Sequence, residues 1–305
     1  MQLTELRPVE PSRKATPEHL RRQAMASVAK LPPFSAVMNK LMTTLADEDV
    51  SFGEVAAVIE QDTVLAGNVL KVVNSAAYGR RGTVNSVRHA VSMLGLSRVR
   101  NTAMSISVGQ MWGRLDLHPQ WSPKQFHLHS TAAAIFADLT AVELVSMGVA
   151  VNYPEGAFAA GLLSGVGLLL IATALRQEYT QLNGCYSHAS DSGGGSLDAC
   201  EQALMGFPHC ELSADILEHW SLPAAIADAV RHANLPGEQP PAALSDVIHL
   251  ATTLATQTGH SIQSWVRPPV GETRATLEQA GFGAKAEALL ATFQVQMKAM
   301  GPFAS

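Results

Sequence analysis

The chain has 305 residues, of which 47% are hydrophobic and only 15% are charged, whereas about 25% are charged in an average protein. At about 150 residues per domain, this length predicts roughly two domains, and the composition excludes an intrinsically disordered chain. The formal charge of −5 excludes a global basic field, so we do not expect nucleic acid as a partner.

Neither a signal peptide nor a disulfide framework is indicated. Residues 1–15 contain two prolines and several charges but no apolar core, and we expect a flexible segment there. Cys185, Cys200 and Cys210 are an odd set without C-x-x-C spacing, which is typical of neither a disulfide scaffold nor a zinc ribbon. We therefore expect a protein of the reducing cytoplasm.

Helix signals follow one another through the first third of the chain. Thr16-Pro17 is typical of a helix start, and this helix is expected to run towards Lys30. Ser51-Phe52-Gly53-Glu54 is a capping box, and Gly95 is placed as a left-handed C-cap. Apolar spacing predicts the remaining helices at about residues 37–45, 52–59, 62–79, 86–95 and 97–112.

A break at residues 113–122, with a proline at 119, predicts the junction between two lobes. Ser122-Pro123 then opens a long helix to Val145. Residues 183–196 are rich in Gly and Ser and are expected to form a flexible loop. No alternating strand pattern occurs, so the prediction is all-α, with shorter helices at 197–205, 209–219, 223–232, 243–257 and 284–300.

The run from Gly156 to Leu175 contains no charge, and by length it meets the criterion for a transmembrane helix. It has no basic cluster and no Trp or Tyr at its ends, and four glycines interrupt it. Amphipathic helices are expected on both sides. We therefore interpret it as a buried helix at the centre of a helical domain, and expect no membrane partner.

Basic residues are concentrated between Thr63 and Leu115, a stretch that contains no Asp or Glu. Seven of the 21 Lys and Arg residues lie there: Lys71, Arg80, Arg81, Arg88, Arg98, Arg100 and Arg114. They form either a solvated face or a patch for phosphate groups or an acidic partner, and Arg80, Arg81, Arg88, Arg98 and Arg100 are the candidates for the second role.

Four segments of the first half belong together: Leu31-Pro32-Pro33-Phe34, Ile59-Glu60-Gln61-Asp62, Val73-Asn74-Ser75-Ala76-Ala77-Tyr78-Gly79 and Ser86-Val87-Arg88-His89-Ala90-Val91-Ser92-Met93-Leu94-Gly95. In combination they resemble the HDOD domain, a helical domain of bacterial signalling that is related to HD-type metal phosphohydrolases. Within them, the motif residues are Asn74, Ser75, Tyr78, Gly79 and Gly95.

This resemblance covers about residues 27–260 and implies a multi-helical, HD-like fold in two packed lobes. We place an N-terminal lobe at 16–113, an HD-like lobe at 114–260 and a helical extension at 261–305. The last helix, which carries Leu289 and Phe293, either packs back on the core or mediates dimerisation.

Comparison with HD hydrolases also implies a remnant pocket. His129 matches their first metal histidine, and Ser164-Gly165 stands where the name-giving His-Asp pair is expected. The other matching positions are His209, His232 and Thr252, the last in place of the closing Asp. His129, His209 and His232 are weak metal candidates, which at best form a three-histidine zinc site, and nothing in the sequence shows that they converge. We instead expect His129 to be a core histidine with one hydrogen bond.

These replacements predict a non-catalytic regulatory protein without a cofactor. It would bind a signalling or regulatory protein, or a nucleotide second messenger. Two alternatives stay open: a metal-dependent phosphohydrolase with altered ligands, and a nucleotide-binding sensor whose phosphates meet the arginines. Nucleophile-elbow, dinucleotide and Walker motifs are not matched.

Overall fold

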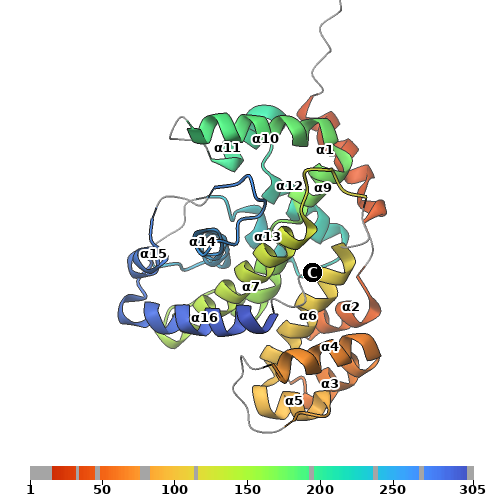
Figure 1. The fold of residues 1–305 in the computed structure, drawn as a ribbon, viewed down its shortest axis with the longest axis vertical. Helices are drawn as coiled ribbons and strands as arrows, with labels where there is room; N and C mark the ends of the chain where they lie inside the picture. Colours follow the sequence, from red (N-terminus) through yellow and green to blue (C-terminus); the bar gives the residue numbers. More distant parts are fainter. Residues whose placement is uncertain are drawn as a thin grey trace, which may run out of the picture.

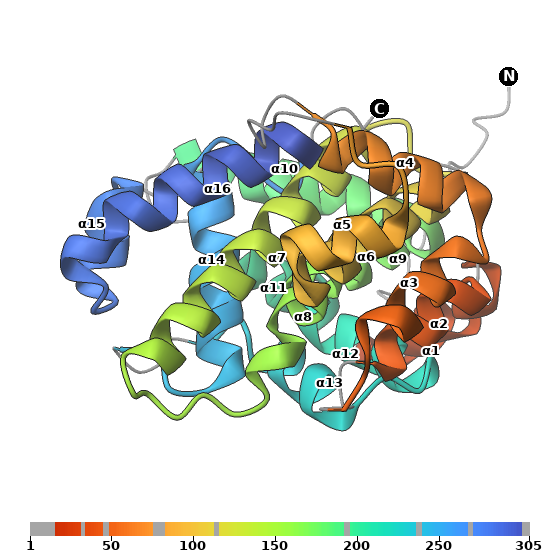
Figure 2. The same cartoon turned by 90° about the horizontal axis from the view of Figure 1, so that it is seen from below.

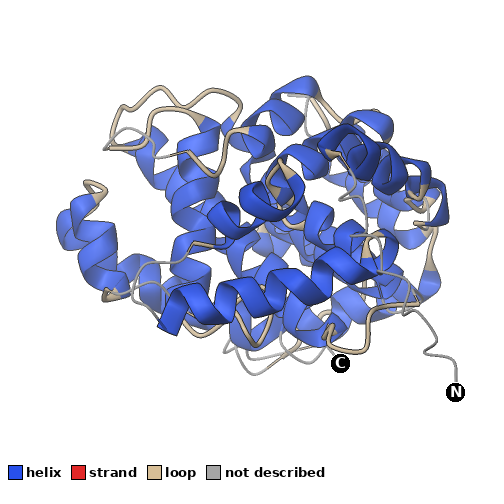
Figure 3. Cartoon of the chain, turned by 90° about the horizontal axis from the view of Figure 1, so that it is seen from above, coloured by secondary structure: helices blue, strands red, loops and turns tan. Residues whose placement is uncertain are grey.

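The computed structural model describes residues 16–31, 34–44, 49–75, 83–112, 116–191, 196–235, 240–267 and 271–300. Within these ranges the regular structure is helical and contains no strand (Figure 3). The prediction of an all-α fold is thereby confirmed.

The first six α-helices precede the predicted junction and include most of the expected boundaries. They are α1 (Pro17–Ala26), α2 (Ala36–Thr43), α3 (Phe52–Glu60), α4 (Thr63–Val73), α5 (Val87–Leu94) and α6 (Leu96–Trp112). The predicted caps Thr16 and Ser51 each accept a hydrogen bond from a backbone N–H of their helix, and Asp62 caps α4 in the same way. α4 ends earlier than predicted, and Gly95 adopts the expected positive φ of 87°.

The remaining helices build the second half of the fold. They are α7 (Pro123–Ser146), α8 (Ala157–Leu163), α9 (Val166–Ala174), α10 (Arg176–Asp191), α11 (Leu197–Met205), α12 (His209–His219), α13 (Ala224–Arg231), α14 (Leu244–Gln257), α15 (Thr273–Gln279) and α16 (Ala286–Met300). Short 3-10 turns lie at Val28–Lys30, Pro154–Gly156 and Gly283–Lys285.

Helix α7 is the centre of the molecule, and α8, α14 and α16 pack directly on it (Figure 1). Helices α2 to α5 gather at one end, at the lower right of Figure 1, and pack on α6 or on one another. α6 in turn contacts α7 and α8. The chain therefore forms two groups of helices that meet where α6 lies against α7.

Helix α1 lies outside the N-terminal lobe in which the sequence placed it. It packs on α9 and α12 instead. Arg21 forms salt bridges with Glu211 at 3.2 Å and with Asp215 at 2.5 Å. These charge-assisted contacts, formed by residues far apart in the sequence, could not be deduced from local patterns.

The uncharged run is divided into α8 and α9, which meet at Ser164 and Gly165. By length and composition, both α7 and the segment Pro154–Ala174 could cross a membrane, but 67% and 89% of their apolar windows are buried within the fold. A Cβ added at Gly161 would lie 2.8 Å from the Ala133 carbonyl oxygen of α7. The glycines of this run therefore permit close helix packing.

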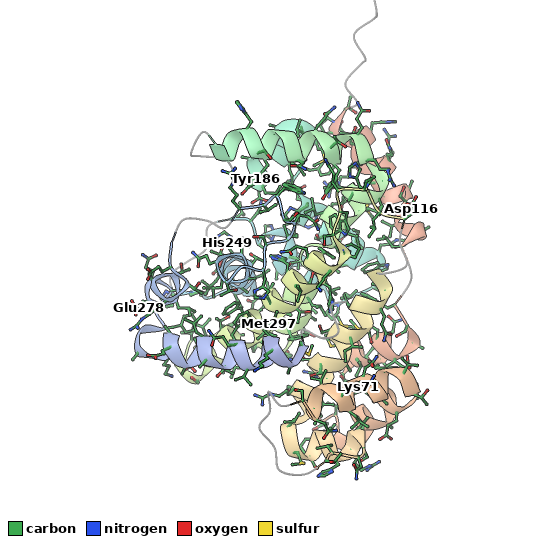
Figure 4. All side chains as sticks on the ribbon, viewed as in Figure 1. Lys71, Asp116, Tyr186, His249, Glu278 and Met297 are labelled. Atoms are coloured by element: carbon green, nitrogen blue, oxygen red, sulfur yellow. The ribbon has the colours of Figure 1, made fainter. Side chains whose placement is uncertain are left out.

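The loop predicted at 183–196 is wrong for residues 183–191, because α10 continues to Asp191. Tyr179, Leu182 and Tyr186 recur at helical spacing and are buried. The Tyr186 ring, labelled in Figure 4, packs 5.8 Å from the ring of Trp265. This apolar stripe outweighs the Gly and Ser content of the segment.

The C-terminal extension folds back on the core. Phe293 of α16 stacks on Phe136 of α7 with ring centroids 3.9 Å apart, and α16 runs alongside α7 (Figure 2). The sequence left open whether this helix packs back or dimerises, and it packs back. α15 was not predicted.

Gly167 gives a test of the close packing between α9 and α12. An added Cβ would lie 2.0 Å from the His209 carbonyl oxygen and 2.7 Å from the Ser213 nitrogen, both of which are backbone atoms. We expect Gly167→Ala to lower the free energy of unfolding by about 3 kcal/mol or more, measured by urea denaturation. The control is Gly184→Ala on α10, where an added Cβ meets nothing within 4 Å and alanine should be neutral or stabilising. Equal stability of the two variants would contradict this packing.

Candidate functional site

Ser164 and Gly165, which stand at the position of the HD pair, are closely packed against neighbouring residues. Ser164 Oγ donates to the Gly161 carbonyl at 3.0 Å, and the Ser164 carbonyl accepts from Ser213 Oγ at 2.6 Å. A Cβ at Gly165 would lie 2.8 Å from Ile262 Cδ1 and 3.0 Å from Phe126 Cε2. An aspartate therefore has no room here unless these apolar side chains move.

His129 is a buried histidine with one hydrogen bond, as the sequence predicts. Its Nδ1 lies 2.6 Å from the His260 carbonyl oxygen. Burial, aided by the charges of His209 and His260, lowers the pKa of His129 to about 4, although the hydrogen bond to the His260 carbonyl opposes this effect. The imidazole is therefore neutral at pH 7, and its Nδ1 must carry the hydrogen that is donated to the carbonyl.

His209 begins α12 and is held by Glu201 of α11. Its Nδ1 lies 2.8 Å from Glu201 Oε2, and its backbone N–H donates to the same oxygen at 2.8 Å. The Glu201 side chain is 0% exposed. A carboxylate at this position satisfies a free N–H at the start of the helix and interacts favourably with the helix dipole.

Burial by itself disfavours the charged imidazole of His209, but the charge and hydrogen bond of Glu201, aided by Asp198, raise the pKa of His209 to about 9. Burial also raises the pKa of Glu201, an effect that His209 opposes. The pair therefore retains a proton across the neutral pH range.

Asp198, Glu201 and His209 also form the candidate metal centre. One ligand atom of each lies within 4.8 Å of the others, and His209 Nδ1 is 3.9 Å from Asp198 Oδ1. Two carboxylates with one imidazole suit divalent ions such as Mn²⁺ or Zn²⁺. Sequence reasoning found His209 but missed both acidic partners, since they lie on another helix and belong to no spaced motif.

The other predicted pocket residues, His232 and Thr252, form their hydrogen bonds outside the candidate metal centre. Nδ1 of His232 lies 2.9 Å from the Asp228 carbonyl, and its side chain is 50% exposed. Thr252 Oγ1 donates to the Ile248 carbonyl of its own helix at 3.0 Å. The donor set therefore does not fit an HD-type metal site: residue 165 supplies no carboxylate, and His232 and Thr252 satisfy their polar atoms elsewhere.

The arginine candidates lie in different environments. Arg88 and Arg98 are exposed, as is Lys71, which is labelled in Figure 4. Arg100, in contrast, is only 6% exposed, and its Nη1 donates to the Thr44 carbonyl at 3.0 Å. Arg100 is therefore buried and does not belong to the exposed basic residues. Arg80, Arg81 and Arg114 lie outside the described residues.

The family motif has a structural role at Asn74. Its Nδ2 donates to the carbonyls of Leu70 and Val84, each at 2.9 Å, and its Oδ1 accepts from the Val84 N–H at 2.8 Å. This side chain therefore joins the end of α4 to the segment that precedes α5. Ser75 follows it and is partly buried, while Tyr78 and Gly79 lie outside the described residues.

The two helix groups meet along a polar seam, which we define as the contacts of Asn101, Ser105 and Gly109 of α6 with α7. Asn101 Nδ2 donates to Asp138 Oδ1 at 3.1 Å, and the hydroxyls of Ser105 and Thr131 are 2.9 Å apart. A Cβ at Gly109 would lie 2.6 Å from His127 Cε1. This seam was not predicted from the sequence, although small and polar residues at i, i+4 and i+8 lie on one helix face.

Comparisons with known proteins agree with this architecture. Residues 31–236 match the model of the HDOD domain. A proposed phosphohydrolase from Shewanella amazonensis SB2B has a TM-score of 0.66 at 22% identity, covering 93% of this chain and 98% of that one. A proposed signal transduction protein from Marinobacter aquaeolei VT8 has a TM-score of 0.68 at 20% identity, covering 96% of this chain and 67% of that one.

One curated relative is an uncharacterized protein of Treponema pallidum (strain Nichols), which is 23% identical over 207 residues. The match covers 68% of this chain and 38% of the relative. This chain therefore spans about two fifths of that relative's length, and the two structural likenesses, both below 25% identity, show the fold alone.

The His209–Glu201 pair predicts a pH dependence of stability. Because the pKa of His209 is raised from 6.5 to about 9, its contribution is complete below pH 6.5 and is lost as the pH rises through 9. We expect the wild-type free energy of unfolding to fall by up to about 3 kcal/mol over this range, relative to Glu201→Gln. Urea denaturation at pH 6, 7.5 and 9.5 measures this difference, with the exposed Glu18→Gln as control. Parallel pH profiles for wild type and Glu201→Gln would contradict the assignment.

Proposed function

The chain belongs to the HDOD domain family, and from that premise we propose that it is a bacterial, cytoplasmic regulatory protein that acts by binding rather than by catalysis. Its partner is another signalling or regulatory protein, or a nucleotide second messenger. The likeness to a proposed signal transduction protein supports this class of function.

The packing around Gly165 is the observation that carries the proposal. Phe126 and Ile262 occupy the space that a carboxylate would need, and Ser164 uses its hydroxyl within its own helix. A hydrolytic centre of the HD type requires carboxylates that hold hard divalent cations and leave room for water. The apolar side chains at this position therefore favour a binding function over hydrolysis.

Exposed basic residues of the N-terminal group provide a surface for an acidic partner. Lys71 of α4, Arg88 of α5 and Arg98 of α6 lie on successive helices that pack on one another. No acidic residue occurs between Thr63 and Leu115, and Asp138 of α7 interacts with the charge of Arg98. Opposite charges on a partner would increase the association rate and orient the complex.

Charge reversal tests this surface. We expect Arg88→Glu to reduce retention of a specific regulatory protein from native lysate by at least tenfold, because it reverses one charge of the contact. The matched control is Arg22→Glu, which reverses an exposed arginine of α1 away from this surface. Retention of chaperones alone, or equal retention by both variants, would contradict the proposed surface.

A second candidate function is that of a metal-dependent phosphohydrolase with altered ligands. The grouping of Asp198, Glu201 and His209 favours it, because their ligand atoms are close enough to hold one ion. A metal ion there would compete with the proton that the His209–Glu201 pair retains.

Turnover measurements distinguish the two candidates. We expect no hydrolysis of phosphomonoesters or cyclic dinucleotides by the purified chain, with or without added Mn²⁺ or Zn²⁺, because the HD position lacks its carboxylate. Metal-dependent turnover that is lost in Asp198→Asn but kept in Asp228→Asn, an exposed control, would overturn the binding proposal and establish the second candidate.

A further inference from the structure

Two carboxylates and one imidazole meet where α11 is followed by α12. Asp198 and Glu201 are three residues apart on α11 and therefore share one face of that helix, and His209 is the first residue of α12. Gly206 ends α11 with a φ of 82°, a conformation that favours glycine, and the chain turns there. This turn brings His209 back onto the face that carries both carboxylates.

The distances between the ligand atoms suit a single metal ion. His209 Nδ1 lies 3.0 and 2.8 Å from the two Glu201 oxygens and 3.9 Å from Asp198 Oδ1. Zn²⁺ binds nitrogen and oxygen at about 2.1 Å, so two ligand atoms of a tetrahedral site lie about 3.4 Å apart. The observed separations lie on both sides of that value. A small rotation of the Asp198 side chain is therefore sufficient to bring all three residues onto one ion.

The Glu201 carboxylate is already oriented by its surroundings. Its side chain is 0% exposed, and the His209 backbone N–H donates to its Oε2 at 2.8 Å, while its Oε1 lies 3.0 Å from His209 Nδ1. Hydrogen bonds of this kind hold metal ligands in place. The Asp198 side chain, in contrast, is 37% exposed and gives an ion access from solvent. The group is therefore fixed on its buried side and open on the other.

The charges of this group are not balanced by the protein. Within the part of the chain that the structure describes, Asp198 and Glu201 form ion pairs with His209 alone. Two carboxylates and one imidazolium leave one negative charge over, and a buried charge without full compensation costs free energy. A divalent ion beside two carboxylates and a neutral imidazole leaves no net charge. The charge balance therefore favours a bound cation.

The types of donor select the ion. Mg²⁺ and Ca²⁺ prefer oxygen ligands alone, whereas Zn²⁺ combines imidazole with carboxylate. For the same nitrogen and oxygen donors, Zn²⁺ also binds more tightly than Mn²⁺. We propose that Asp198, Glu201 and His209 bind one Zn²⁺ ion, which links α11 to the start of α12.

This site differs from the metal site that HD hydrolases would imply. Of its three ligands, only His209 is at an HD-like position, and both carboxylates come from α11. The inference goes beyond the proposed binding function, because it assigns a metal ligand to the chain, and it requires no hydrolysis. An ion held between α11 and α12 would stabilise the end of α12 that packs on α9, since it binds the folded chain alone.

Calorimetry and thermal melts test the proposal on the full chain without an affinity tag, after chelator treatment and dialysis. We expect saturable binding of one Zn²⁺ per chain, at least tenfold weaker binding of Mg²⁺, and a higher melting temperature with Zn²⁺. Co²⁺ should give the strong visible absorption of a four-coordinate site. Asp198→Asn, a substitution of a partly exposed side chain, should weaken Zn²⁺ binding at least tenfold and remove the thermal shift.

Asp228→Asn is the matched control. Asp228 also lies beside a histidine, with 3.4 Å between His232 Nδ1 and its Oδ1, but this pair is exposed and contains a single carboxylate. We therefore expect Asp228→Asn to keep the Zn²⁺ affinity and the thermal shift of the wild type.

Several results would overturn this assignment. They are no saturable Zn²⁺ binding, equal affinities for Zn²⁺ and Mg²⁺, and Zn²⁺ binding that Asp198→Asn leaves unchanged or that Asp228→Asn weakens equally. If Asp198→Asn fails to fold, the wild-type stoichiometry and the Co²⁺ spectrum still decide. If Zn²⁺ fails to bind while Arg88-dependent partner capture persists, the metal site is wrong and the regulatory function stands. If Zn²⁺ binds and the chain then hydrolyses phosphomonoesters, the site stands and the non-catalytic function is wrong.

Discussion

The packing of Phe126 and Ile262 against Gly165 is the constraint on which this interpretation of the molecule depends. Gly165 lies between the buried helices α8 and α9. The space beside its Cα is occupied by the side chains of Phe126 and Ile262. Apolar contacts at this density resist the introduction of a charge, because a buried carboxylate without partners loses its hydration. The apolar contacts that stabilise the centre of the fold therefore also leave no space for a metal-binding carboxylate at position 165.

Polar interactions lie outside this apolar centre, between α6 and α7. The α6–α7 seam joins the two helix groups through Asn101–Asp138 and Ser105–Thr131. His127 lies at the other end of the seam, where burial lowers its pKa to about 4 and its Nδ1 has no partner. Buried polar atoms without partners are rare in native proteins, which distinguishes this seam from the apolar centre.

The sequence predicted the features that neighbouring residues determine, such as helix bounds and helix faces. Capping residues and apolar spacing placed α11 and α12 at their observed bounds, and the single hydrogen bond of His129 was expected from its apolar helix face. It failed where tertiary contacts decide: α10 is helical because Tyr179 and Tyr186 are buried, and α1 is held on α12 by Arg21. The Glu201–His209 pair and the polar seam were missed for the same reason, since their members come from different helices.

Restoring the lost carboxylate tests the central claim most directly. The measurement is the free energy of unfolding of Gly165→Asp, by urea denaturation, together with Mn²⁺ binding by calorimetry. Because Phe126 and Ile262 fill the site, we predict a loss of about 3 to 5 kcal/mol and no gain in Mn²⁺ affinity. A Gly165→Asp variant that keeps wild-type stability and binds Mn²⁺ more tightly than the wild type would contradict this account of the fold and its function.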